Sequence, residues 1–398
     1  VAVPILYFSQ LRFWGNNLSV VSIVKCSDYE QKRIDRAVKE SLSLIGGLDR
    51  VVKAGQKVLL KVNMLNADPP EKAVTTHPAL LRSVIRAVKE VKGEVIVGEA
   101  PGIAYKDIEK AWHVTGLKKA AKEEGAKVIN FHKVERIDNS QNKQVPVLHL
   151  AGEVLESDIV ISLPKLKTHN FTLFTGAIKN LYGCIPGFHK KELHRLVPRP
   201  EDFARLMIDI FAVIKPDLAI MDGIVGMEGD GPAAGPPRKI GVVLASQDLV
   251  ALDAVASHII GYAPFDIDIT RVAAERGLGE GKLEKIEIKG APLSEVKIED
   301  YQLASSINVL LNKVPGFVLF AFRHLAPWVL KIKPVINKDR CTKCEECIGH
   351  CPTEAMKMGK DCPIIDTKRC IKCFCCQEFC LERAVGIKYN WLAKRFQI

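Results

Sequence analysis

The C-terminal part of the sequence repeats one cysteine spacing, C-x-x-C-x-x-C-x-x-x-C, twice, with an offset of 29 residues. A cubane [4Fe-4S] cluster needs four thiolates, and a tight C-x-x-C-x-x-C loop supplies three of them. In two-cluster chains of this spacing, the fourth cysteine of each copy ligates the other cluster. The pattern therefore predicts two [4Fe-4S] clusters that carry single electrons. One is assigned Cys341, Cys344, Cys347 and Cys380, and the other Cys370, Cys373, Cys376 and Cys351.

Two other uses of cysteine fit this pattern less well. Structural zinc sites pair C-x-x-C knuckles and have no third cysteine in each loop. Disulfides are disfavoured because no secretory signal is evident and the cysteines crowd into one tail. Cys375 stands beside Cys376 as a spare thiol; either could bind iron, but only Cys376 keeps the repeat in register. We expect the isolated Cys26, Cys184 and Cys362 to be buried or incidental thiols.

The composition is that of an ordinary globular chain with a basic balance. Its 398 residues are 47% hydrophobic and 26% charged, with a formal net charge of +11. Two oxidised clusters with their thiolates, each about −2, would lower this to about +7. A basic balance fits an anionic substrate, an acidic partner, nucleic acid or a membrane surface. Aromatic residues are not interleaved with arginine as in a nucleic-acid platform, so we expect no nucleic acid and favour an anionic ligand.

Composition divides the chain into four segments. Residues 1–19 are apolar but too short to span a bilayer, and form an uncertain N-terminal extension. Residues 20–300 are assigned to an α/β domain, 301–333 to an apolar helical linker and 334–398 to a two-cluster ferredoxin domain. Within the linker, residues 314–330 contain two prolines, an arginine and a histidine, which favours an interfacial helix pair, with contact to a membrane surface as an alternative. With no reliable membrane-spanning segment in the sequence, we expect a cytoplasmic protein.

Between residues 20 and 290, short β-rich runs alternate with helical periods. This alternation predicts an α/β fold, a mostly parallel sheet with helices on both faces, followed by a small α+β ferredoxin-like domain. Strands are expected at Val20–Val24, Lys57–Val62, Glu94–Val97, Lys127–Phe131, Asp158–Ser162, Asp217–Met221 and Ile240–Ala245. Helices are expected at Glu30–Leu44 and Pro78–Val91, over most of Lys106–Glu124, and over much of Thr172–Leu181, Glu201–Ile214 and Leu249–Ile260.

Polar side chains follow four of these strands. Asn63 follows KVLLKV, Glu99 follows VIVG, Lys165 and Lys167 follow DIVISLP, and Asp222 follows DLAIM. In open α/β sheets, ligands bind beyond the carboxyl ends of the strands. The sequence therefore predicts one composite site at this edge of the sheet.

The centre of this site is expected in the segment LPKLKTHNFTLFTGAIKNLYGCIP, residues 163–186. A helix opening near Asn170 would point its N-terminal amides at an anion and carry Lys179 and Asn180. The alternative is that the lysines form a solvated face, but their apolar neighbours favour desolvated amines that titrate near neutrality. Candidate catalytic residues are Lys165, Lys167, His169, Lys179 and Asp222. Candidate substrate ligands are Asn63, Glu99, Asn170 and Asn180.

Several stretches resemble one known family. VSIVKCSDYE, KVLLKVNML, TTHP, VGEAPG, ISLPKLKTH, GAIKNLYGCIPG and MDGIVGMEGDGP are similar to the domain of unknown function numbered 362. Its members are commonly labelled uncharacterised iron–sulfur centre proteins, and many carry a C-terminal two-cluster ferredoxin module. Here residues 334–390 resemble a bacterial-type two-[4Fe-4S] ferredoxin domain, with Leu381 in place of an expected proline. The resemblance implies an iron–sulfur protein but names no activity.

Three functions fit these observations. The first is a reductase-type oxidoreductase that passes electrons from a low-potential partner protein to a small anionic or carbonyl-bearing substrate at the sheet edge. The second is a non-catalytic electron-transfer or adaptor protein that docks a partner enzyme. The third is a redox-responsive or cofactor-maturation factor. The polar edge of the large domain favours the first, because docking alone does not need it.

Overall fold

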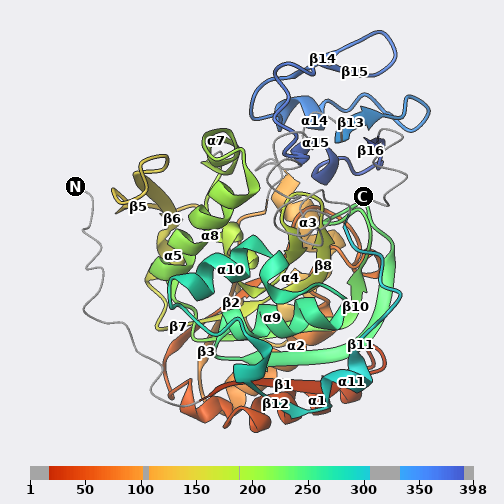
Figure 1. The fold of residues 1–398 in the computed structure, drawn as a ribbon. Coiled ribbons are helices and arrows are strands. Elements are labelled where there is room, and N and C mark those ends of the chain that lie inside the picture. Colours follow the sequence, from red (N-terminus) through yellow and green to blue (C-terminus); the bar gives the residue numbers. More distant parts are fainter. Residues whose placement is uncertain (1–17, 102–106, 188, 305–331, 390–398) are drawn as a thin grey trace.

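The computed structural model describes residues 18–101, 107–187, 189–304 and 332–389 of the chain. A sheet with helices around it makes up the larger part, and the cysteine-rich residues 332–389, in blue, lie against one edge of it (Figure 1). The N-terminal extension and the apolar linker, with its segment 314–330, fall almost entirely outside the described ranges. Within these ranges, no helix combines the length and apolarity needed to cross a membrane.

Ten strands form one sheet in the larger part. They are β1 (Ser19–Lys25), β2 (Lys57–Val62), β3 (Glu94–Glu99), β4 (Lys127–Asn130), β7 (Ile159–Leu163), β8 (Lys165–His169), β9 (Leu173–Thr175), β10 (Leu218–Met227), β11 (Pro237–Ser246) and β12 (Ile286–Gly290). The main order is β12-β1-β11-β10-β7-β2-β3-β4, with β8 paired to β10 and β9 to β8. β11 is antiparallel to both neighbours, and the other pairings along this order are parallel. The parallel strands therefore bring their carboxyl ends to one edge.

Helices cover both faces of the sheet, which confirms the predicted fold class. One face is covered by α1 (Gln31–Leu44), α2 (Pro78–Glu90), α3 (Ile108–Val114) and α4 (Leu117–Glu123). The other is covered by α6 (Ala177–Asn180), α8 (Pro200–Ile214), α9 (Leu249–Ile259) and α10 (Asp268–Glu275). Successive residues of a strand point to opposite faces. In β2, Val58 and Leu60 pack in the first layer and Leu59 in the second.

Smaller elements lie around this core. A hairpin of β5 (Val134–Asp138) and β6 (Val147–Ala151) precedes α5 (Gly152–Leu155). The helix α7 (His189–Leu196) rises beside the cysteine-rich part, and α11 (Leu293–Val296) follows β12 (Figure 1).

Two predicted helical stretches differ in detail. The stretch Lys106–Glu124 is mostly helical, as predicted, but it is divided into α3 and α4 at Gly116, whose φ of +71° suits the left-handed region open to glycine. The helix expected over Thr172–Leu181 begins only at Ala177, because Leu173–Thr175 pairs with β8 as strand β9. The buried Asp253 fixes this start by accepting hydrogen bonds from the amides of Ala177 and Ile178, at 2.6 and 3.1 Å. Those amides are therefore not open to a substrate anion.

The cysteine-rich part is a structural repeat as well as a sequence repeat. Its elements are β13 (Ile332–Ile336), α14 (Glu346–Gly349), β14 (Met356–Met358), β15 (Pro363–Ile365), α15 (Cys375–Glu378) and β16 (Val385–Tyr389). β13 pairs antiparallel with β16, and β14 with β15. Left-handed residues recur with the offset of the cysteines: Lys343, Glu345 and Glu354 in the first copy, Lys372, Phe374 and Arg383 in the second. Each cysteine loop thus folds in the same way.

Candidate functional site

The eight cysteines of the repeat line two cavities, four in each. One cavity is lined by Cys341, Cys344, Cys347 and Cys380, and the other by Cys351, Cys370, Cys373 and Cys376. The last cysteine of each copy thus joins the first three of the other. The ligation itself stays a prediction, but four thiols around a closed space are the donor set that a [4Fe-4S] cluster takes.

Backbone donors support this fit. The amide of Ala355 donates to Cys351 Sγ and the amide of Ala384 donates to Cys380 Sγ, both at 3.2 Å. Hydrogen bonds to the sulfurs tune the potential of an iron–sulfur cluster and favour the thiolate form. The equivalent bond in both copies shows that the two cysteine cavities are built in the same way.

A third cavity, of about 460 Å³, lies between the carboxyl edge of the sheet and the cysteine-rich part. Its walls come from the loops after β2 and β3, from β8, α6 and α7, and from both cysteine loops. β3 lies on one side of β2 and β7 on the other, so the cavity is placed where the strand order reverses. Ligands of open α/β sheets bind at this point, and the volume is in the range of small-molecule sites. We call it the interdomain cavity.

The structure brings five of the nine predicted edge residues to this cavity. They are Asn63, Glu99, Lys167, Lys179 and Asn180. The other four do not line it: Lys165 and Asp222 form a separate buried cluster, and His169 and Asn170 contact the cysteine-rich part.

Lys167 and Lys179 are the cations of the cavity floor. Lys167 Nζ donates to the carbonyl of Val74 at 2.6 Å, and burial together with the nearby Lys179 lowers the pKa of Lys167 to about 7. Burial also lowers the pKa of Lys179. Its ammonium faces the rings of Tyr182 and Phe203, 5.9 and 5.8 Å from their centroids, and makes no hydrogen bond within the described ranges. Two amines held this way can bind an anion, and Lys167 can also give up a proton near neutral pH.

Glu99 and Asn180 line the cavity but are held by a buried network. Glu99 Oε2 accepts from Lys61 Nζ at 2.8 Å and from the amide of Met64 at 3.0 Å. Asn180 Oδ1 accepts from Lys61 Nζ at 3.2 Å, and Asn180 Nδ2 donates to the carbonyl of Lys61 at 3.0 Å. A Cβ on Gly183 would lie 2.1 Å from Glu99 Oε1, so only glycine fits against this network. Its role is to fix β2, β3 and α6 relative to one another at the cavity.

Replacing Lys61 by methionine should destabilise the protein by about 3–5 kcal/mol, because the carboxylate of Glu99 would be left buried without its counter-charge. Urea unfolding under anaerobic conditions measures the change. A matched control is Lys118→Met, which breaks an exposed ion pair with Glu109 and should cost less than about 1 kcal/mol. Adding Glu99→Gln to Lys61→Met should restore part of the loss; no recovery would show that the charge of Glu99 is not the cause.

Lys165 and Asp222 lie in a second buried cluster. Lys165 Nζ is 2.9 Å from Asp222 Oδ2 and donates to the hydroxyl of Tyr29 at 2.7 Å, and that hydroxyl donates to Asp222 Oδ1 at 2.8 Å. Burial alone would raise the pKa of Asp222, but Lys165 and His77 outweigh it and hold the pKa below its ordinary value. Tyr29 stacks on His77 with ring centroids 3.6 Å apart. With its polar atoms paired to one another, this cluster ties α1, α2 and β10 together.

His169 and Asn170 hold the cysteine-rich part to the sheet. His169 Nδ1 accepts from the amide of Phe171 at 3.1 Å, which leaves the proton on Nε2, and Nε2 faces Glu378 Oε1 at 3.3 Å. Asn170 Nδ2 donates to Gln377 Oε1 at 2.8 Å. Gln377 and Glu378 end α15, the helix of the predicted iron ligand Cys376. These contacts place one cysteine loop directly on the end of β8.

Buried polar atoms without partners point to a ligand in the interdomain cavity. Thr175 Oγ1, His194 Nδ1 and Asn63 Oδ1 line it without a hydrogen-bond partner among the described residues. Thr175 and His194 are only 4% and 7% exposed. Buried polar groups are nearly always paired, so these atoms call for a ligand or ordered water. Burial and Lys179 lower the pKa of His194 to about 3, which makes it a neutral hydrogen-bonding group at physiological pH.

Thr175 and His194 were not among the residues predicted from the sequence. Neither residue follows a strand of the main order at its carboxyl end. The ring of His194 is held at the cavity by packing on Phe171, Tyr182 and Phe203. Cys375, noted in the sequence as a spare thiol, also lines it.

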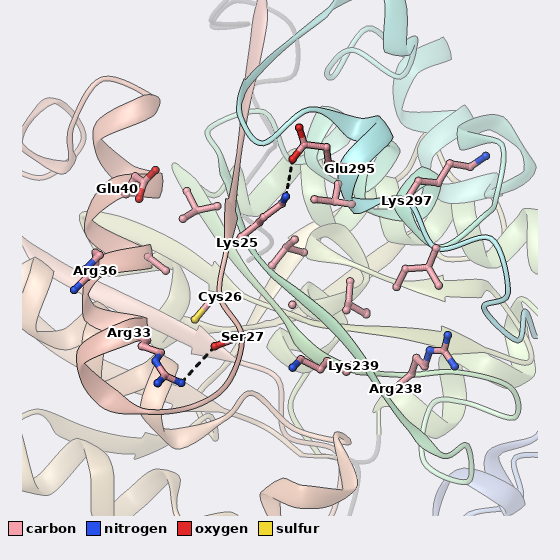
Figure 2. A pocket seen from close by; sticks show the side chains of 17 residues that line it. Lys25, Cys26, Ser27, Arg33, Arg36, Glu40, Arg238, Lys239, Glu295 and Lys297 are labelled. Carbon is pink, nitrogen blue, oxygen red and sulfur yellow. Dashed lines mark hydrogen bonds and ion pairs between the residues drawn. The ribbon is translucent and has the colours of Figure 1, made fainter.

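A wider groove, of about 930 Å³, lies at the end of β1 between α1, β11 and α11, on the side of the sheet away from the cysteine-rich part. Figure 2 shows that its charged side chains spread around an open space instead of converging. Lys25 pairs with Glu295 at 2.6 Å and Arg238 with Asp300 at 2.6 Å, whereas Arg36 and Lys239 are unpaired within the described ranges. None of its described residues has a buried polar atom without a partner. It lacks the features that make the interdomain cavity a candidate site.

Comparison with known families assigns both parts of the chain. Residues 58–258 match the family described as "Domain of unknown function (DUF362)". Residues 334–357 match the family described as "4Fe-4S binding domain".

Among individual proteins, the chain is similar to the thylakoid-associated protein sll1697 of Synechocystis sp. They are 30% identical over 309 residues, which cover 76% of this chain and 94% of the relative. Solved structures are more distant. The lactate racemase apoprotein of Thermoanaerobacterium thermosaccharolyticum has a TM-score of 0.39 at 13% identity, over 61% of this chain and 57% of that one. A protein of Thermotoga maritima has a TM-score of 0.33 at 13% identity, over 56% of this chain and 57% of that one. In both cases the match spans less than two thirds of the other chain.

Proposed function

The chain belongs to the family of the domain of unknown function 362 and carries a 4Fe-4S binding domain, which gives it a role in electron transfer. From the residues of the interdomain cavity, we propose the following activity. The protein is an iron–sulfur reductase with two [4Fe-4S] clusters. A small anionic or carbonyl-bearing substrate binds in the interdomain cavity and accepts single electrons there.

One observation carries this proposal: the substrate cavity and the first cysteine cavity share a wall. Cys344, Glu345 and Glu346 line both of them. Lys167 and Lys179 line the same substrate cavity from the sheet edge. A ligand between them would touch an electron donor on one side and cationic proton donors on the other, which is the arrangement a reduction needs.

The roles of the residues follow from their contacts. Lys179, which has no hydrogen-bond partner of its own among the described residues, binds the anionic group of the substrate. Thr175 and His194 orient it through their free polar atoms. When bound, the clusters supply electrons one at a time. Reduction of a carbonyl to an alcohol takes two electrons, which come from a low-potential donor protein, and two protons. Lys167 gives one proton to the substrate oxygen, and solvent supplies the other.

The compound released by denaturing anaerobically purified wild-type protein tests this function. Added to protein whose clusters have been reduced with dithionite, it should restore the bleached visible absorbance and be recovered in a form heavier by two hydrogens, as mass spectrometry would show. The same extract from Lys179→Met protein should lack the compound, because the cation that retains it is gone. Reduced clusters that stay bleached in the presence of the wild-type extract would argue for an electron carrier without a substrate of its own.

A further inference from the structure

We propose that the electron donor is a small acidic redox protein and that it docks on the solvent side of the second cysteine loop. The docking surface is formed by Lys368, Arg369 and Lys372, which we call the cationic patch. This inference rests on the proposed function, because it assigns the point at which electrons enter the protein on their way to the substrate in the interdomain cavity.

The second cysteine loop has one face inside the protein and one outside. Cys373 to Glu378 are buried, and Gln377 and Glu378 contact the end of β8. The three residues of the cationic patch are exposed, and Cys370, between Arg369 and Lys372 in sequence, is partly exposed. The predicted ligand Cys370 therefore lies beneath the patch, where a docked protein would approach its cluster most closely.

The patch carries charge that is largely unpaired within the described ranges. Its three cations fall within five positions, and among the described residues one ion pair involves them, between Arg369 and Glu354 at 3.7 Å. Lys368 and Lys372 form no ion pair within the described ranges. Lys372 takes a left-handed backbone conformation, with φ of 58°, which turns the chain at the surface. Complementary charge of this kind speeds the encounter with an acidic partner.

The first cysteine loop differs in the charge that it presents. Cys344 and Glu345 are exposed, and acidic side chains at Asp339, Glu345 and Glu346 accompany its basic residues. Cys344, Glu345 and Glu346 also line the interdomain cavity. The cavity of the second cluster has no lining residue in common with the interdomain cavity. Electrons would therefore enter at the patch, pass from the cluster on Cys370 to the cluster on Cys344, and leave into the cavity.

Stopped-flow reduction of the full-length protein by an acidic plant-type ferredoxin tests this entry point. The triple variant Lys368→Glu, Arg369→Glu, Lys372→Glu should be reduced roughly tenfold more slowly than wild type at low ionic strength, and added salt should narrow the difference. The matched control reverses three cations of the groove in Figure 2, Arg36, Lys239 and Lys297, and should be reduced at the wild-type rate. Both variants should reach the wild-type end point with excess dithionite.

The ferredoxin and dithionite measurements distinguish a wrong docking site from a wrong proposed function. Equal ferredoxin rates for the patch variant and wild type, or an equal slowing in the groove variant, would overturn the docking site while leaving the reductase intact. Wild-type protein that dithionite does not bleach would overturn the proposed function, and the entry point with it. Substrate is absent from both arms, so the ferredoxin result does not depend on its identity.

Discussion

Replacing Cys380 by alanine should remove the cluster of the first cysteine loop, although Cys380 belongs to the second copy of the repeat. Cys380 lines the cavity of Cys341, Cys344 and Cys347, and it is the fourth thiolate available there. The chain should then fall from about eight iron atoms to about four, because each cluster holds four. Iron analysis after anaerobic purification measures the loss.

The reciprocal variant and a neighbouring thiol serve as controls. Cys351→Ala should remove the other cluster and also leave about four iron atoms. Cys375→Ala should retain about eight, since Cys375 lines the interdomain cavity and neither cysteine cavity. Only the Cys380 variant should block electron delivery to the substrate while the ferredoxin still reduces what remains. Full iron content in Cys380→Ala, or its loss in Cys375→Ala, would show that the crossed assignment is wrong.

The sequence could predict the grouping of the cysteines because local spacing determines it. Three thiols of each copy lie in one short loop, and the backbone of that loop is repeated with the same offset, down to the left-handed Lys343 and Lys372. The sharing of Cys351 and Cys380 follows from that repeat. Because each copy of the pattern spans only eleven residues, contacts with the rest of the chain are not needed to predict the grouping of the cysteines.

The edge of the sheet was predictable for a similar reason. Parallel strands end on one side, so a polar residue after β2 or β3 must reach that side, and Asn63 and Glu99 do. The hydrophobic periodicity of the sequence could not show which residues each of these side chains would contact. Glu99 pairs with Lys61, which the strand register sets beside Gly98, the neighbour of Glu99 in β3. Asp222 pairs with Lys165, which lies directly opposite it in the register of β10 and β8.

The remainder of the site depends on contacts between distant parts of the chain. Asn170 and Gln377 are 207 positions apart, and their contact sets the cysteine-rich part over the sheet. The start of α6, which aims Lys179, is fixed by Asp253, 76 positions after Ala177. Local propensity is a weak guide where such tertiary contacts choose the helix boundary. The ring of His194 is held at the cavity by Phe171, Tyr182 and Phe203, and no sequence signal marked it.

Replacing Lys167 by methionine should lower the rate of substrate reduction by about 10²–10⁴-fold, the range expected for loss of a general acid. Methionine keeps much of the buried volume but removes both the cation and the proton. Iron content and dithionite bleaching should stay at the wild-type level, since Lys167 contacts neither cysteine cavity. The rate is measured with the compound released from wild-type protein. Lys239→Met, in the groove of Figure 2, is the matched lysine control and should react at the wild-type rate.

The pH dependence of the reaction identifies Lys167 as the proton donor. Burial, together with Lys179 and Lys165, lowers the pKa of Lys167 to about 7, against the opposing effects of Glu378 and Asp68. Below that pH the amine is protonated and can both attract the anion and donate; above it both properties are lost. Wild-type kcat/KM should therefore fall as pH rises through about 7, and Lys239→Met should show the same fall. In Lys167→Met the residual activity should be flat across this range. If kcat/KM of Lys167→Met still fell with rising pH as in the wild type, another group would be the proton donor. The second amine of the cavity floor, Lys179, would then be the next residue to replace.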